Sequence, residues 1–173
     1  AGGQESISLV QTKEMRVQPD RELVEMHNSI YMPMLQTAEV VAKRYNIGRD
    51  AMDEYALQSQ QRTAAAQAAG YFDAEIVPVT TMMNVVNKET GEVSQKEVTI
   101  AKDEGNRADT QLSGLQALQP VLGPDMTITA GNASQLSDGS SASILMEAKL
   151  AEKKGLTPLG RYVGMAVAGT EPD

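Results

Sequence analysis

The chain has 173 residues, of which 41% are hydrophobic and 22% are charged, and its formal net charge is −8. This composition is typical of a folded domain, the negative charge disfavours duplex nucleic acid as a partner, and no apolar stretch reaches the ~20 residues of a membrane-spanning helix. The absence of cysteine and the single histidine, His27, predict no disulfide, no catalytic thiolate and no metal site within these residues.

Helices are predicted in the first part of the chain. Residues 21–28 fit a short helix, and residues 37–46 fit a second one with Thr37 as its N-cap. The clearest helix spans residues 49–69, and Gly70 follows where a glycine commonly ends a helix. Its expected inward face has residues at i, i+3, i+4 and i+7: Met52, Tyr55, Ala56 and Ser59. Its alanine-rich end could bind a partner, but core packing is the preferred interpretation.

Strands are predicted next. Residues 75–80 fit a short strand, and residues 82–86 and 96–102 fit a polar hairpin with Thr90 and Gly91 at its turn. Thr110 then starts a short helix that carries three leucines and ends before a proline: Leu112, Leu115, Leu118 and Pro120.

The stretch TAGNASQLSDGSSA, residues 129–142, consists almost entirely of small or polar residues. Small residues let a ligand approach the backbone closely, although a plain surface loop would look the same. A strand at 141–147, a helix at 147–155 ended by Gly155, and a strand at 159–169 follow. This order predicts a layered α/β core, with both strands covered on both faces because they are almost wholly apolar.

Both ends of the chain have unusual sequences. The first residues, AGGQESISLV, and the last, YVGMAVAGTEPD, are typical of interior strands of a larger sheet. A complete domain seldom begins and ends inside its core, so we expect the chain to be part of something larger. No secretory leader is visible, and we expect a cytoplasmic protein.

Five segments, in order, resemble motifs of the thiolases. They are AGGQES (1–6), the stretch from MLQTAEVVAKRYNIGRD to AEIVPV (34–79), GNRADTQLSGLQALQPVL (105–122), TAGNASQLSDGSSA (129–142) and LGRYVGMAVAGTEP (159–172). The resemblance implies an α/β fold of two similar βαβαβαββ halves with a loop domain inserted in the first half. Residues 1–10 would end that first half, residues 11–134 would form the coenzyme A-binding loop domain, and residues 135–173 would begin the second half.

The resemblance also implies an activity. Thiolases such as acetyl-CoA acetyltransferase and the 3-ketoacyl-CoA thiolases of fatty-acid β-oxidation transfer an acyl group to or from coenzyme A through an acyl-cysteine. Coenzyme A or acyl-CoA would be the substrate, no cofactor would be permanently bound, and the parent enzyme would be a homodimer or homotetramer. The family's catalytic cysteine should precede Ala1, and its histidine and second cysteine should follow Asp173. We therefore expect no catalytic residue in this chain and no activity from the chain alone.

The resemblance places coenzyme A at four residues. Ser134 would hydrogen-bond the pantetheine amide, and the backbone of Ala130 would line the same channel. Arg107 would stack on adenine or pair with phosphate at the nucleotide end, and Met34 would lie along the pantetheine tunnel. Small residues around 129–142 would then admit the pantetheine arm.

Other interpretations of these residues remain open. Ser134 could simply form a turn, Met34 could pack in the core, and Arg107 could balance the charges of its acidic neighbours, Asp103, Glu104 and Asp109. Asn132 and Asp138 are expected to brace the loop rather than touch a ligand.

The acyl chain length stays open because the chain departs from family patterns at Pro33, Gly48 and Gly114. Two other classes of function are also possible. The chain could be a non-catalytic module of natural length that binds coenzyme A or a protein, or a structural helical protein that uses its alanine-rich helix as an interface. The length of the reading frame would distinguish a longer enzyme from a module.

Overall fold

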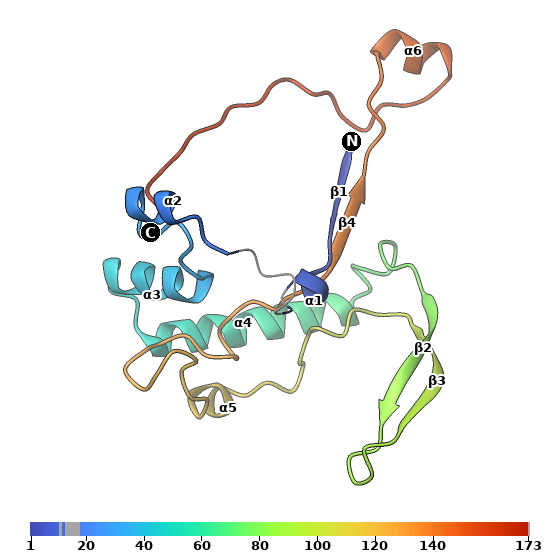
Figure 1. The fold of residues 1–173 in the computed structure, drawn as a ribbon. Coiled ribbons are helices and arrows are strands. Elements are labelled where there is room, and N and C mark those ends of the chain that lie inside the picture. Colours follow the sequence, from blue (N-terminus) through green and yellow to red (C-terminus); the bar gives the residue numbers. More distant parts are fainter. Residues whose placement is uncertain (11, 13–17, 173) are drawn as a thin grey trace. The chain divides into compact units, whose positions relative to one another are not determined.

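The computed structural model describes residues 1–10, 12 and 18–172, and the chain divides into two units. Unit 1 comprises Ala1–Thr37 and Ser134–Asp173, and unit 2 comprises Ala38–Ala133. Figure 1 shows the elements of both units, and each unit is described by itself. The three-domain division expected from the sequence stays a prediction.

Unit 1 contains the first elements of the chain and the last ones. They are β1 (Gly2–Glu5), α1 (Ile7–Val10), α2 (Arg21–Met26), the start of α3 (Met34–Arg44), β4 (Gly139–Ala142) and α6 (Ala148–Lys153). The short helix predicted at 21–28 is confirmed as α2, and Asp20 caps it by accepting a hydrogen bond from the Leu23 N–H (2.9 Å).

Strands β1 and β4 form a two-stranded antiparallel sheet. Their register pairs Gly2 with Ala142 and Glu5 with Gly139. A Cβ atom on Gly2 would lie 2.5 Å from the Ser141 carbonyl oxygen, so the close approach of the strands requires glycine there. The strand expected at 1–10 is confirmed at Gly2–Glu5. The strand prediction is wrong for residues 7–10, which form α1. The Ser6 carbonyl accepts hydrogen bonds from the Leu9 and Val10 N–H groups at the start of this helix.

The expectations for the C-terminal residues are confirmed only in part. Helix α6 forms where predicted and is followed by Gly155 at φ 65°. The strand predicted at 141–147 forms only at its first two residues, and residues 159–169 form no strand. Their apolar side chains, expected to be covered on both faces, are exposed; Val163 is 91% exposed. A strand needs a neighbour to take its hydrogen bonds, and within the described part of the chain residues 144–147 and 159–169 pair with no strand.

Unit 2 contains the rest of α3, the long helix α4 (Arg49–Ala68) and the short helix α5 (Leu112–Gln116). Helix α4 confirms the clearest prediction from the sequence, and Gly70 follows it at φ 72°. Thr37 is not the N-cap of α3, because the Pro33 carbonyl already accepts hydrogen bonds from the N–H groups of Gln36 and Thr37. Thr110 is not the N-cap of α5, because that place belongs to Gln111.

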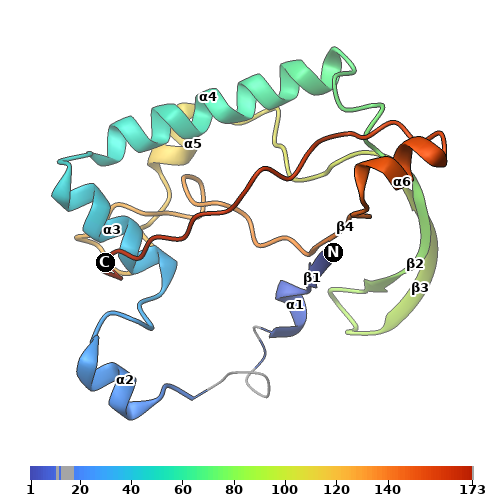
Figure 2. The same cartoon turned by 90° about the horizontal axis from the view of Figure 1, so that it is seen from above.

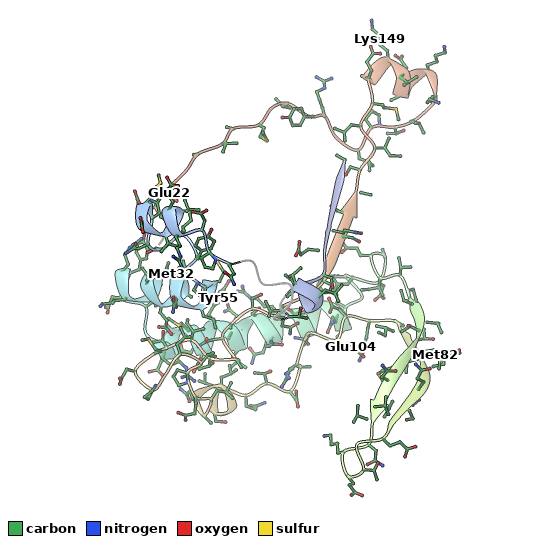
Figure 3. All side chains as sticks on the ribbon, viewed as in Figure 1. Glu22, Met32, Tyr55, Met82, Glu104 and Lys149 are labelled. Carbon is green, nitrogen blue, oxygen red and sulfur yellow. The ribbon has the colours of Figure 1, made fainter. Side chains whose placement is uncertain are left out.

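The buried face of α4 differs from the expected one. Tyr55, labelled in Figure 3, is 72% exposed, whereas Asp53 is completely buried. Helix α4 packs against α5, where Leu115 is buried, and the buried apolar side chains of unit 2 also include Ala42 and Ile128. Asp53 can be buried because its carboxylate has hydrogen-bond partners inside the unit, which are described below.

Unit 2 also contains the predicted hairpin. Strands β2 (Val79–Val86) and β3 (Val93–Ile100) pair antiparallel, from Val79 opposite Ile100 to Val86 opposite Val93 (Figure 2). At the turn the Asn87 side chain accepts hydrogen bonds from the N–H groups of Glu89 and Thr90, and Gly91 adopts φ 72°. The separate strand predicted at 75–80 is wrong, because residues 79 and 80 belong to β2 and residues 75–78 form no strand. Among the described helices, none combines the length and apolarity that crossing a bilayer requires.

Candidate functional site

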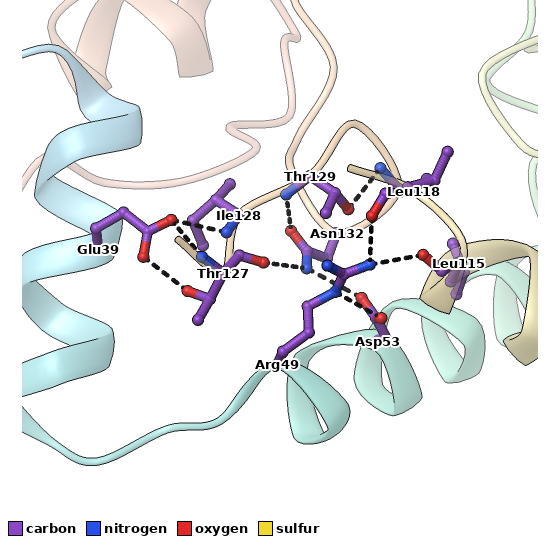
Figure 4. A network of polar contacts seen from close by, with 10 residues as sticks. Glu39, Arg49, Asp53, Leu115, Leu118, Thr127, Ile128, Thr129 and Asn132 are labelled. Atoms are coloured by element: carbon purple, nitrogen blue, oxygen red, sulfur yellow. Dashed lines mark hydrogen bonds and ion pairs between the residues drawn. The ribbon is translucent and has the colours of Figure 1, made fainter. Parts of the chain in front are cut away.

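The loop of residues 127–133 is fastened to α3 by one carboxylate. Glu39 Oε1 accepts hydrogen bonds from the N–H groups of Thr127 (2.8 Å) and Ile128 (2.7 Å), and Oε2 accepts one from the Thr127 hydroxyl (2.7 Å) (Figure 4). Burial raises the pKa of Glu39, but these hydrogen bonds outweigh it and leave the pKa below its usual value. The carboxylate is therefore ionised at neutral pH and satisfies two main-chain donors of the loop.

A second carboxylate fastens the same loop to α4. Asp53 Oδ1 accepts a hydrogen bond from Asn132 Nδ2 (3.0 Å), and Oδ2 accepts one from Arg49 Nε (2.7 Å). Asn132 Nδ2 also donates to the Thr127 carbonyl (3.1 Å), while Asn132 Oδ1 accepts from the Thr129 N–H (2.8 Å). The expectation that Asn132 braces the loop is confirmed, and these bonds account for the buried position of Asp53.

Arg49 extends this network to α5. Its Nη2 donates to the carbonyl oxygens of Leu115 (2.7 Å) and Leu118 (3.1 Å), at the end of α5. The guanidinium is therefore held by one carboxylate and two carbonyls in a fixed fork. We call the set Glu39, Arg49, Asp53 and Asn132 the loop clamp (Figure 4). Among the described residues, no buried polar side-chain atom lacks a hydrogen-bond partner.

Gly131 shows why this loop contains small residues. A Cβ atom at this position would lie 2.6 Å from Leu115 Cδ2 and 2.6 Å from Leu118 Cδ1. Contacts this short would force the two leucines to move, so α5 packs directly on the loop backbone. Internal packing thus disfavours a side chain at Gly131, independently of any ligand.

Next to this fixed backbone lie two of the four residues expected at coenzyme A. Ala130 and Ser134 are both exposed, although Thr129 is completely buried. The Ser134 hydroxyl makes one long hydrogen bond, to the Gln135 carbonyl at 3.4 Å. Its hydroxyl is therefore open to a stronger partner.

Met34 and Arg107 are exposed as well. Met34 is 79% exposed at the start of α3, so it does not pack in the core of its own unit. Within the described residues the Arg107 guanidinium makes no hydrogen bond and no ion pair, so the acidic side chains near it in sequence do not neutralise it by contact.

The four expected residues are divided between the units. Met34 and Ser134 belong to unit 1, while Arg107 and Ala130 belong to unit 2. Glu39, Arg49 and Asp53 were not predicted from the sequence. Only the i, i+4 spacing of Arg49 and Asp53 could have suggested that they pair.

Unit 1 has a surface cavity of about 690 Å³ at the junction of β1, α1 and β4. Its lining includes Ser6 and Asp138, whose side chains are joined by a hydrogen bond of 3.0 Å. Asp138 thus braces its segment, as expected, and none of the four residues expected at coenzyme A lines this cavity. The described His, Asp and Glu side chains contain no group of three that could hold a metal ion.

Comparison with known proteins assigns the family. The model of the thiolase N-terminal domain matches residues 1–149. The chain is 39% identical over its full 173 residues to the 3-ketoacyl-CoA thiolase of Bacillus subtilis, covering 44% of that protein. It is 46% identical over 140 residues to the β-ketoadipyl-CoA thiolase of Pseudomonas aeruginosa, covering 81% of this chain and 32% of that protein.

A solved structure agrees with this assignment. The crystal structure of human mitochondrial 3-ketoacyl-CoA thiolase matches 91% of this chain and 40% of its own, with a TM-score of 0.64 and 36% identity. The chain thus spans less than half the length of these relatives. The family match and the structural likeness together show that the chain belongs to the thiolase family and has a thiolase-like α/β fold.

Proposed function

We propose that residues 1–173 form the part of a thiolase that binds coenzyme A while an acyl group is transferred to or from it. The observation that carries this proposal is the loop at 127–133. Its backbone is fixed by the loop clamp, while the adjacent Ala130 and Ser134 are exposed. A solved structure of human mitochondrial 3-ketoacyl-CoA thiolase in complex with CoA, 36% identical with a TM-score of 0.63, supports coenzyme A as the ligand.

Each of the four residues has a role in the proposal. The Ser134 hydroxyl hydrogen-bonds an amide of the pantetheine arm, and the Ala130 backbone lines the channel for that arm. Met34 provides exposed apolar surface along the arm. The unpaired Arg107 guanidinium binds the nucleotide end, by stacking on adenine or pairing with phosphate.

The acyl-transfer chemistry itself is proposed to need residues outside this chain. Transfer through an acyl-cysteine requires a thiolate and a base that generates it, and the 173 residues contain no cysteine. We therefore expect the isolated chain to cleave no 3-ketoacyl-CoA in the presence of coenzyme A. An assay that follows thioester cleavage spectrophotometrically, with a complete thiolase as positive control, tests this expectation.

Calorimetric titration with coenzyme A tests the binding roles in a complete thiolase that contains residues 1–173. Ser134→Ala removes one hydrogen bond, about 0.5–1.5 kcal/mol, and should weaken binding several-fold at any salt concentration. Arg107→Ala should also weaken binding, but less so as salt is raised, because salt screens the attraction between the charged guanidinium and the nucleotide. Ser59→Ala and Arg21→Ala, at exposed positions on α4 and α2, are the matched controls.

The result that would contradict these roles is equally specific. If Ser134→Ala and Arg107→Ala both bind coenzyme A as tightly as the unaltered enzyme, the residue assignments are wrong. If the unaltered enzyme itself does not bind coenzyme A, the proposed function is wrong.

A further inference from the structure

The segment of residues 103–107 is attached along one face of α4 by two glutamines. Gln60 Oε1 accepts a hydrogen bond from the Arg107 main-chain N–H (2.8 Å), and Gln67 Nε2 donates one to the Asp103 carbonyl (3.1 Å). Gln67 lies seven positions after Gln60, which is about two helical turns, so both side chains lie on the same face of the helix. Both glutamine side chains are half-buried, and in these two hydrogen bonds each is paired with a main-chain group.

Two further residues complete the attachment around Arg107. Asn106 Nδ2 donates to the Gln60 carbonyl (2.9 Å) and to Gln60 Oε1 (2.8 Å), which fixes the orientation of the Gln60 amide. On the other side, the Arg107 carbonyl accepts hydrogen bonds from the Thr110 hydroxyl (2.7 Å) and the Thr110 N–H (3.1 Å). The N–H and C=O groups of Arg107 are therefore both held.

The side chain of the same residue is free. Among the described residues, the exposed Arg107 guanidinium has neither a hydrogen bond nor an ion pair. The Arg107 backbone is fixed while its charged group is unpaired. This arrangement favours binding, because little backbone motion is left to be lost when a ligand binds.

We propose that Gln60 is a positioning residue for the nucleotide end of coenzyme A. It acts through Arg107: its side-chain oxygen fixes the Arg107 backbone, and thereby the point from which the guanidinium reaches the nucleotide. This inference rests on the proposed function, because it takes the ligand of Arg107 to be coenzyme A. Gln60 itself touches no ligand in this account.

The test measures binding of coenzyme A, and of pantetheine, by calorimetry in a complete thiolase that contains these residues. Pantetheine lacks the nucleotide, so it cannot report on Arg107. Gln60→Met preserves the length of the side chain but removes the acceptor. It should raise the Kd for coenzyme A about two- to tenfold, because the Arg107 N–H loses its acceptor, and leave the Kd for pantetheine unchanged. Gln61→Met, at the exposed neighbouring position on the same helix, should change neither value.

A double-mutant cycle of Gln60→Met with Arg107→Ala tests whether Gln60 affects coenzyme A binding through Arg107 or independently of it. If Gln60 acts through Arg107, then Gln60→Met should weaken binding little or not at all once Arg107 is already alanine. Asn106→Ala keeps the Arg107 N–H bond to Gln60 and removes the two bonds that Asn106 Nδ2 donates, one to the Gln60 main-chain carbonyl and one to Gln60 Oε1. It should therefore raise the Kd for coenzyme A less than Gln60→Met does, and it provides a second test if Gln60→Met does not fold.

Three outcomes overturn the inference. They are an unchanged Kd for coenzyme A in Gln60→Met, an equal loss for pantetheine and coenzyme A, and full additivity with Arg107→Ala. If Arg107→Ala weakens coenzyme A binding while Gln60→Met does not, this inference fails and the proposed function stands. If Arg107→Ala has no effect either, the assignment of Arg107 to the nucleotide fails.

Discussion

At the scale of single residues, polar side chains determine the position of the loop at 127–133. Glu39 and Asn132 accept hydrogen bonds from three successive main-chain N–H groups, those of residues 127, 128 and 129. Such donors are costly when buried and unpaired, so each acceptor restricts where the loop can lie. The sequence predicted the bracing role of Asn132. It gave no sign of Glu39, because the spacing between Glu39 and Thr127 is 88 residues.

Glu39 should make stability depend on pH in the acid range. Its pKa in the folded chain is lowered from the usual 4.5, so its stabilising contribution is fully present above about pH 4.5 and is lost as the pH falls through the folded pKa. Glu39→Gln keeps one acceptor oxygen but removes the charge. The difference in unfolding free energy between the unaltered chain and this variant should be largest at neutral pH and shrink towards pH 3. Urea unfolding measured across this range tests the prediction, with Glu54→Gln, an exposed position on α4, as control. A constant difference would show that the charge of Glu39 does not act in this way.

Gly131→Ala should destabilise the chain because the new methyl group would overlap two leucines. With both carbons 2.6 Å from the added Cβ, we expect a loss of about 1–3 kcal/mol. Gly114→Ala is the matched control, since a Cβ there meets nothing within 4 Å and lies inside α5. Alanine is the better helix former, so the control should stabilise by about 0.5–1 kcal/mol. Thermal unfolding of both variants provides the comparison, and equal effects would disprove the packing argument.

At the scale of elements, the helices and strands that were predicted correctly are those whose sequence pattern lies within the element itself or its turn. Helix α4 has high helix propensity along its length and a glycine just after its end, and the hairpin turn has Gly91 in the conformation that glycine adopts most readily. The inward face of α4 could not be predicted in the same way. Asp53 is buried because Asn132, 79 residues away, supplies a donor, and that contact exists only in the folded unit.

The attachment of α5 to α4 depends on the shape of the Arg49 side chain. A lysine keeps the charge but cannot donate to Asp53 and to two carbonyls in the same planar fork. Arg49→Lys should therefore destabilise by about 1–3 kcal/mol and speed amide hydrogen exchange in α5. Arg62→Lys, at an exposed position on α4, should do neither. If exchange in α5 is unchanged in Arg49→Lys, the bonds to Leu115 and Leu118 do not hold that helix.

At the scale of the whole molecule, the family and its fold class were predictable and the C-terminal strands were not. Each motif that suggested a thiolase is a continuous stretch of sequence. The family match over residues 1–149 confirms the family and covers all of these motifs except the last one, at 159–172. Residues 159–169 have the apolar pattern of a buried strand, but a strand also needs a hydrogen-bonding neighbour, which no pattern within the segment can supply. The four residues expected at coenzyme A were predicted from the resemblance, and their exposure is compatible with that role.

Hydrogen exchange with and without saturating coenzyme A tests the central claim most directly, in a complete thiolase that contains residues 1–173. If this segment binds coenzyme A as proposed, exchange should slow at residues 105–110 and 129–135, and the hairpin of β2 and β3 should be unaffected. Unchanged exchange in both segments at saturation, with protection elsewhere in the protein, would contradict the account.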